Sequence, residues 1–109
     1  MRELLDRRPD LDAVFAAGDS MAVGALACLR ERGVDVPGGI SVIGFDDMPI
    51  SVDVTPPLST VRLPLEDIGV RAMSLALREP GAEPRVEHAA AELVLRGSTA
   101  PPPAGGRRR

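Results

Sequence analysis

The chain has 109 residues, 44% of them hydrophobic, and a formal net charge of −3. This apolar content predicts a single small globular domain and argues against an intrinsically disordered chain. The negative charge, with no Trp or Tyr, argues against a nucleic-acid-binding surface within the chain.

The first elements along the chain predict a strand–helix–strand unit. Residues 2–8 are typical of the end of a helix that stops before Pro9. Two short apolar runs, residues 12–17 and 40–45, predict buried strands. Near-continuous apolar strands are typical of a parallel sheet that is covered on both faces. The predicted fold class is therefore α/β, built on a parallel βαβ unit.

The helix between these strands is predicted over Ser20 to Arg32 from apolar residues at helical spacing. Asp19 or Ser20 is the expected side-chain cap of its first turn, and Gly33 fits its end. Cys28 falls within this pattern and is expected to be a buried structural residue. One cysteine excludes an intrachain disulfide and is consistent with a reducing compartment.

The second half of the chain predicts less regular structure. Residues 46–57 read as a long loop, and residues 58–62 as a short extended segment. A helix is predicted from Pro64 to Glu79, since proline is favourable in a first turn. A last strand is predicted within residues 89–98, and residues 102–109 are predicted to be a disordered tail.

Polar residues follow both strands of the βαβ unit. The first strand is followed by Gly18, Asp19 and Ser20, and the second by Asp46 and Asp47. Ligands of open parallel sheets bind beyond the carboxyl ends of the strands, so these groups are expected at one edge. If strand geometry persists, one of the paired aspartates faces a crevice and the other accepts N–H groups of the following loop. Alternatively, both aspartates only organise the loop.

Catalytic chemistry finds little support in these residues. Asp46 has no partner residue for acid–base work, and His88 lies in a polar segment that predicts an exposed side chain. The absence of lysine argues against a phosphate-accepting receiver domain. No Cys/His spacing, P-loop or dinucleotide motif is present. We therefore expect no enzymatic activity, no metal and no cofactor.

Four blocks in order carry a family resemblance: "DAVFAAGDSMAVGAL", "VPGGISVIGFDDMPI", "TPPLSTVRLP" and "ELVLRGSTAPP". Together they resemble the C-terminal part of the sensor domain of the lactose/galactose repressor (LacI/GalR) family of bacterial transcriptional regulators. The resemblance covers about residues 3 to 102. It implies the C-terminal portion of a periplasmic-binding-protein-like (type I) fold that is incomplete here. The start at Met1 without a helix cap is consistent with a truncated or mis-started reading frame.

The resemblance also implies a division of the chain. Residues 1–101 would be the C-terminal part of a ligand-sensing domain. Within it, residues 1–61 and 86–98 would form the C-terminal subdomain. The helix over residues 64–80 would belong to a missing N-terminal subdomain, which would leave its apolar stripe exposed.

Site residues follow from the resemblance position by position. Asp46, the first acid of "GFDD", matches the ligand-contacting aspartate of the family. Gly18 replaces the asparagine of a motif usually written "AND", and Asp19 matches the acid of that motif. Gly18 and Asp19 therefore join Asp46 as candidate ligand-binding residues, although Asp19 is more typical of a helix cap. In "TVRLP" the family often has glutamine where Leu63 stands.

The resemblance further implies that Met21, Val23 and Val54 belong to a dimer interface; ordinary core packing is the alternative for Met21 and Val23. The implied function is part of the effector-binding and dimerisation domain of a cytoplasmic regulator. Its partners would be a sugar, a second subunit and no membrane. DNA contact would be made only by a helix-turn-helix domain outside this chain. The alternative is a solute-binding protein of a sugar transporter, which shares the fold.

Overall fold

The computed structural model describes residues 1–78, 83 and 85–102. Residues 103–109 of the predicted disordered tail lie outside the described residues. In chain order the elements are α1 (Arg2–Arg7), β1 (Ala13–Phe15), α2 (Asp19–Glu31), β2 (Ser41–Ile43), α3 (Ile50–Asp53), β3 (Thr60–Arg62), α4 (Leu65–Ala76) and β4 (Glu92–Val94).

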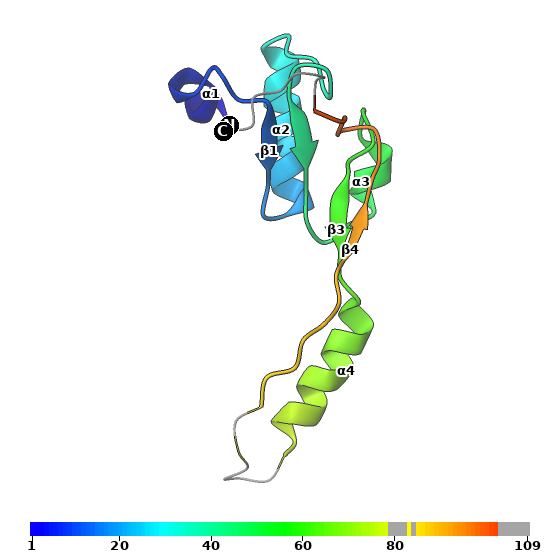
Figure 1. The fold of residues 1–109 in the computed structure, drawn as a ribbon. Coiled ribbons are helices and arrows are strands. Elements are labelled where there is room, and N and C mark those ends of the chain that lie inside the picture. Colours follow the sequence, from blue (N-terminus) through cyan, green and yellow to red (C-terminus); the bar gives the residue numbers. More distant parts are fainter. Residues whose placement is uncertain (79–82, 84, 103–109) are drawn as a thin grey trace.

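The predicted βαβ unit is confirmed. β1 and β2 pair in parallel with Val14 opposite Val42, and α2 connects them (Figure 1). Both strands are shorter than predicted, since the backbone leaves the ladder to start α2 or to enter the following loop. The helix predicted before Pro9, α1, also forms and ends at Arg7. Gly33 has a φ of 68°, as expected for a residue that ends a helix.

The two later extended segments pair with one another. β3 and β4 are antiparallel, with Thr60 opposite Val94. A parallel bridge between Ile43 and Ser59 places the start of this pair beside the end of β2. As a result, the carboxyl end of β2 lies next to a strand that is remote from it in sequence.

The hydrophobic core lies between α2 and β2. Leu29, Val42 and Leu58 are fully buried, from the helix, the strand and the segment before β3. Cys28 is buried as predicted. Fully burying such aliphatic side chains contributes about 1.5–3 kcal/mol each. The core therefore holds the βαβ unit and the start of the β3–β4 pair together.

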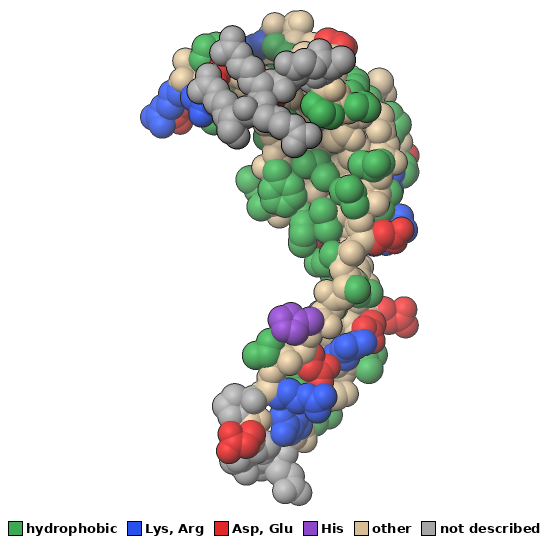
Figure 2. All heavy atoms as spheres, in the orientation of Figure 1, with side chains coloured by type: hydrophobic (Ala, Val, Ile, Leu, Met, Phe, Trp, Pro, Cys, Tyr) green, Lys and Arg blue, Asp and Glu red, His purple; other side chains and the backbone are tan. Residues whose placement is uncertain are grey.

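The chain is elongated, with principal extents of 56 × 34 × 26 Å. Its radius of gyration is 18.0 Å, against about 13 Å for a compact domain of this size. Figure 1 shows the reason: α4 stands away from the α/β body, joined to it by a neck of β3 and β4. In Figure 2, apolar side chains gather over the body, whereas charged side chains lie over the part below the neck.

No residue of α4 is buried, so the prediction of an exposed apolar stripe on this helix is confirmed. On this stripe Leu65 is 60% exposed, and Ile68 and Leu75 are half-buried, although an apolar helix face is usually buried. α4 ends at Ala76, earlier than the predicted Glu79, which lies outside the described residues. No helix in the described part of the chain is long and apolar enough to cross a bilayer.

The prediction that residues 46–57 form an irregular loop was wrong in part. The four-residue helix α3 forms within this segment. Its β-branched residues have weak helix propensity, so the sequence carried little signal for it. Backbone hydrogen bonds close it, among them those from Ser51 N to Met48 O at 2.9 Å and from Val54 N to Ile50 O at 3.3 Å.

Candidate ligand-binding site at the carboxyl ends of the parallel strands

Gly18 and Asp46 lie at the same edge of the sheet, as predicted. The amide of Asp19 donates a hydrogen bond of 2.9 Å to the carbonyl of Phe45, which draws the two strand ends together. A Cβ added to Gly18 would lie 3.7 Å from Oδ2 of Asp46, an ordinary van der Waals contact. The residue in the Gly18 position therefore sits beside the Asp46 carboxylate.

Asp46 has an unusual backbone. Its φ is 101° and that of Asp47 is 53°, so neither residue continues the strand geometry. Positive φ values are uncommon for residues other than glycine, and strained residues cluster at functional sites. The amide of Asp46 donates to the carbonyl of Val61 in β3 at 2.9 Å, which stabilises this conformation.

Asp46 is half-buried. None of the hydrogen bonds or ion pairs formed among residues 1–78, 83 and 85–102 involves its carboxylate. Its oxygens are therefore available to hydroxyl groups of a ligand. Phe15 and Phe45 lie at the same strand ends, with their rings edge to face and centroids 6.4 Å apart.

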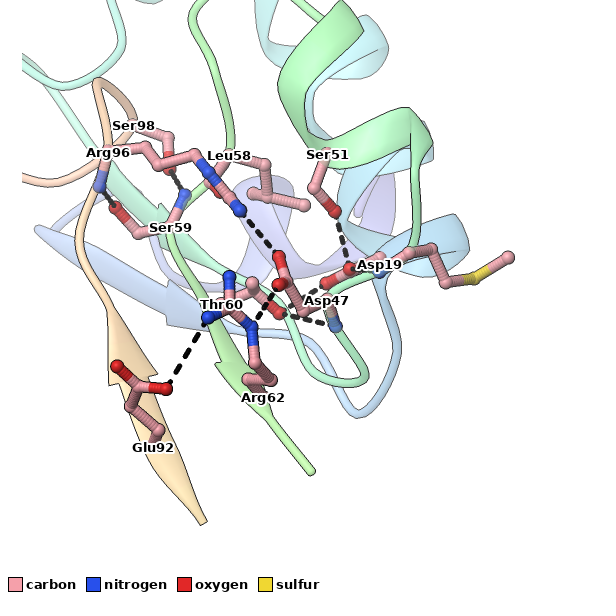
Figure 3. Close-up of polar contacts among 11 residues, drawn as sticks. Asp19, Asp47, Ser51, Leu58, Ser59, Thr60, Arg62, Glu92, Arg96 and Ser98 are labelled. Atoms are coloured by element: carbon pink, nitrogen blue, oxygen red, sulfur yellow. Dashed lines mark hydrogen bonds and ion pairs between the residues drawn. The ribbon is translucent and has the colours of Figure 1, made fainter. Parts of the chain in front are cut away.

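Asp19 does not act as the predicted helix cap. Gly18 occupies the cap position, and no side-chain hydrogen bond caps α2. The carboxylate of Asp19 instead turns inward and is fully buried. It accepts hydrogen bonds from the amide of Met48 at 2.7 Å, Ser51 Oγ at 2.5 Å and Thr60 Oγ1 at 2.6 Å (Figure 3). A buried carboxylate needs such donors to offset its desolvation, and this geometry supplies them.

These bonds join α2, the start of α3 and β3 through one side chain. A direct contact between Asp19 and a ligand would require some of them to break. Gly44 gives the carboxylate its space: a Cβ there would overlap Oδ1 of Asp19 and lie 3.0 Å from Cδ2 of Leu58. The glycine of the "GFDD" block is thus required by close approach.

Asp47 binds two arginines, which corrects the prediction that its carboxylate accepts N–H groups of the following loop. Oδ2 accepts from Nε of Arg62 and Oδ1 from Nη2 of Arg96, both at 2.6 Å (Figure 3). Burial alone would raise the pKa of Asp47, but the hydrogen bonds from Arg96 and Arg62 outweigh it and lower that pKa. The two adjacent aspartates therefore have different roles: one is free and the other is paired.

Arg96 is held firmly in this cluster. Its side chain is only 15% exposed, its Nη1 donates to the carbonyl of Leu58 at 2.7 Å, and its amide donates to Ser59 Oγ at 2.8 Å. Arg96 was not predicted from the sequence. A signal was present, because a charged residue that interrupts the apolar run "ELVLRGS" needs a partner if the strand is buried.

The three predicted dimer residues line two different hollows of the chain. Met21 is 64% exposed and lines a hollow with α1 and β1, of about 770 Å³. Val23 and Val54 line a different hollow of about 340 Å³, between α2 and the α3 segment. Val54 also packs partly against the core. Met21 and Val23, two positions apart on a helix, thus face different sides.

His88 is exposed, as predicted. In the part of the chain that the structure describes, no group of three or more His, Cys, Asp or Glu side chains has a geometry that could hold a metal ion.

A family model described as a periplasmic binding protein-like domain matches residues 1–99. The transcriptional regulator MalR of Streptomyces coelicolor is 44% identical over 97 residues, which cover 86% of this chain and 28% of that protein. The lactose operon repressor of Rhizobium radiobacter is 38% identical over 102 residues, covering 92% of this chain and 88% of that protein. The chain therefore spans less than a third of the length of MalR.

Solved structures of transcriptional regulators are also similar to this chain. The complex of the regulator CelR with cellobiose superposes with a TM-score of 0.72 at 38% identity, covering 89% of this chain and 31% of that one. A LacI-type regulator from Bifidobacterium animalis superposes with a TM-score of 0.78 at 31% identity, covering 91% of this chain and 36% of that one.

Proposed function

This chain belongs to the lactose/galactose repressor (LacI/GalR) family of transcriptional regulators, and on that premise we propose that it forms one wall of an effector site for a sugar. The chain corresponds to a portion of the family's sensor domain. The relatives of the chain that are named above are transcriptional regulators. A regulator of this family bound to cellobiose is among the similar structures. We therefore do not propose the transporter alternative or an enzymatic role.

The observation that carries this proposal is the state of Asp46. Its carboxylate lies at the end of β2 beside Gly18, on a strained backbone and without a partner among the described residues. A carboxylate accepts two hydroxyl hydrogen bonds in a directional, charge-assisted way, which suits a polyol. The backbone at Gly18 lines the adjacent space, and Asp19 acts indirectly by holding the strand ends.

In the complete regulator, a second lobe would close the site from the opposite side. Ligand affinity for one arrangement of the lobes would then bias how a cytoplasmic dimer presents its DNA-binding domains. We propose that Val23 and Val54 contribute to the dimer interface on the α2–α3 side, and that Met21 contributes from the α1 side. DNA contact would belong to a helix-turn-helix domain outside this chain.

The test is an NMR titration of the chain with cellobiose, lactose and galactose. Because the chain offers one wall of the site, we expect weak binding, with amide shifts clustered at Gly18, Phe45 and Asp46. Asp46→Asn should abolish these shifts, since an amide offers one acceptor oxygen and no charge. Asp53→Asn, at an exposed position of α3, is the matched control and should leave them unchanged.

Two results would overturn the proposal. The first is the absence of saturable shifts at these residues for every sugar. The second is tight binding of operator-like DNA by the chain itself, because its net charge of −3 and the proposed division of roles both predict none.

A further inference from the structure

The ion pairs around Asp47 lie where the neck leaves the α/β body. β3 runs into α4 through Leu63 and Pro64, and β4 brings the chain back to the body (Figure 1). Arg62 is the last residue of β3, and Arg96 lies just beyond the end of β4. Both guanidinium groups bind the same carboxylate, so Asp47 ties the outgoing and returning strands together.

The same segment holds Asp46. The amides of Asp46 and Asp47 both donate to β3, to the carbonyl of Val61 at 2.9 Å and to Thr60 Oγ1 at 3.3 Å. The two residues share a peptide bond and both have positive φ. Because they are adjacent, a backbone rotation at one moves the other. The direction of the Asp46 carboxylate therefore depends on how the Asp47 side chain is held.

Arg96 and Arg62 do not contribute equally. The side chains of Arg96 and Asp47 are 15% and 11% exposed, whereas that of Arg62 is 48% exposed. Removal of the Arg96 charge would leave a poorly solvated carboxylate with only the exposed partner. Arg62 also reaches Glu92 of β4 at 3.4 Å, a pair that solvent weakens. We therefore expect Arg96 to contribute more than Arg62 to holding the Asp47 side chain in place.

We propose that Asp47 is a positioning residue for Asp46, and that Asp47, Arg62 and Arg96 form a coupling cluster between the ligand site and the neck. This inference rests on the proposed function in one respect, that a sugar contacts Asp46. Contact at Asp46 would shift the adjacent Asp47, and with it the two strands that carry α4.

The first test needs no ligand. In the native chain, the intraresidue NOE between the amide and Hα protons of Asp46 should be strong, because its φ is positive. Arg96→Gln should weaken this NOE and shift the Asp46 amide, and Arg62→Gln should do so to a smaller extent. Arg71→Gln is the matched control, since it removes an ion pair with Asp67 within α4. It should leave both signals unchanged.

The exposed position of Arg62 keeps this test usable if Arg96→Gln fails to fold. An Asp46 NOE that is unchanged in every folded variant would overturn the positioning role. A loss of overall stability without a change at Asp46 would mean that the cluster is only structural, which also contradicts the proposal.

The second test follows the Nε–H signals of Arg62 and Arg96 during titration with cellobiose, lactose and galactose. A sugar that shifts the Gly18 and Asp46 amides should also shift these two signals, and Asp46→Asn should remove both responses. If the amides respond and the arginine signals stay still, the coupling is wrong while the proposed function stands. If the amides themselves do not respond, the proposed function fails, and the NOE test still decides the positioning role.

Discussion

Removal of the Asp19 carboxylate should be among the most damaging single changes to this chain. Asp19→Ala leaves three donors without an acceptor: the Met48 amide, Ser51 Oγ and Thr60 Oγ1. A buried donor without a partner costs about 1–3 kcal/mol. Because the two hydroxyl groups can rotate toward other acceptors, we take the lower half of that range. For three donors the expected loss in the free energy of unfolding is about 3–6 kcal/mol.

A loss of that size approaches the whole stability of a typical domain, which is about 5–15 kcal/mol. Asp19→Asn should cost less, about 2 kcal/mol, because the amide oxygen keeps an acceptor and only the charge-assisted part of the bonds is lost. The measurement is urea unfolding of each variant, followed by helical circular dichroism. The midpoint and slope together give the free energy of unfolding.

Ser20→Ala is the control, because it lies in the same first turn and, among the described residues, its hydroxyl hydrogen-bonds only to the exposed Met48 sulfur, at 3.6 Å. It should change the free energy of unfolding by less than about 0.5 kcal/mol. If Asp19→Ala and Ser20→Ala differ by less than about 1 kcal/mol, the carboxylate is not a buried hydrogen-bonding centre, and this account of the site is refuted.

Further changes test other parts of the structure by the same unfolding assay. Gly44→Ala should destabilise the chain by about 1–3 kcal/mol because its methyl overlaps a buried carboxylate, whereas Gly24→Ala, with open space in α2, should stabilise it slightly; equal effects would contradict the packing described. The lowered pKa of Asp47 means that its ionised form stabilises the fold above the unfolded pKa of about 3.9, and that this contribution is lost as pH falls through the folded pKa. Asp47→Asn should therefore lower stability at neutral pH and approach the native chain in acid; a constant difference across pH would exclude this linkage. Leu29→Ala should cost about 2–5 kcal/mol, while Met73→Gln on the exposed face of α4 should cost less than about 0.5 kcal/mol; a large effect of Met73→Gln would show that α4 packs against the body.

The larger features of the fold were predictable because their signals are local. Periodic apolar residues predicted α2, and two apolar runs predicted β1 and β2. Parallel pairing then required both strand ends to meet at one edge, so Gly18 and Asp46 were expected together, and they are. The exposure of α4 was implied by the family resemblance, which assigned this helix to a second subdomain.

The roles of the carboxylates were not predictable in the same way. Asp19 was assigned to a helix cap on local grounds, but the burial of its carboxylate depends on Ser51 and Thr60, which are distant in sequence. The pairing of Asp47 likewise depends on where β3 and β4 bring two arginines. α3 escaped prediction because its residues have little helix propensity and it is held by contacts rather than by pattern.

Sequence alone was therefore sufficient for the α/β class, the parallel unit, the edge that carries the candidate site and the family. Each of these depends on periodicity or on ordered blocks of residues along the chain. Tertiary structure alone decided which aspartate is buried, which is paired and which is free. That choice depends on burial and on charged partners brought together across long sequence separations, and three aspartates are chemically identical until the chain folds around them.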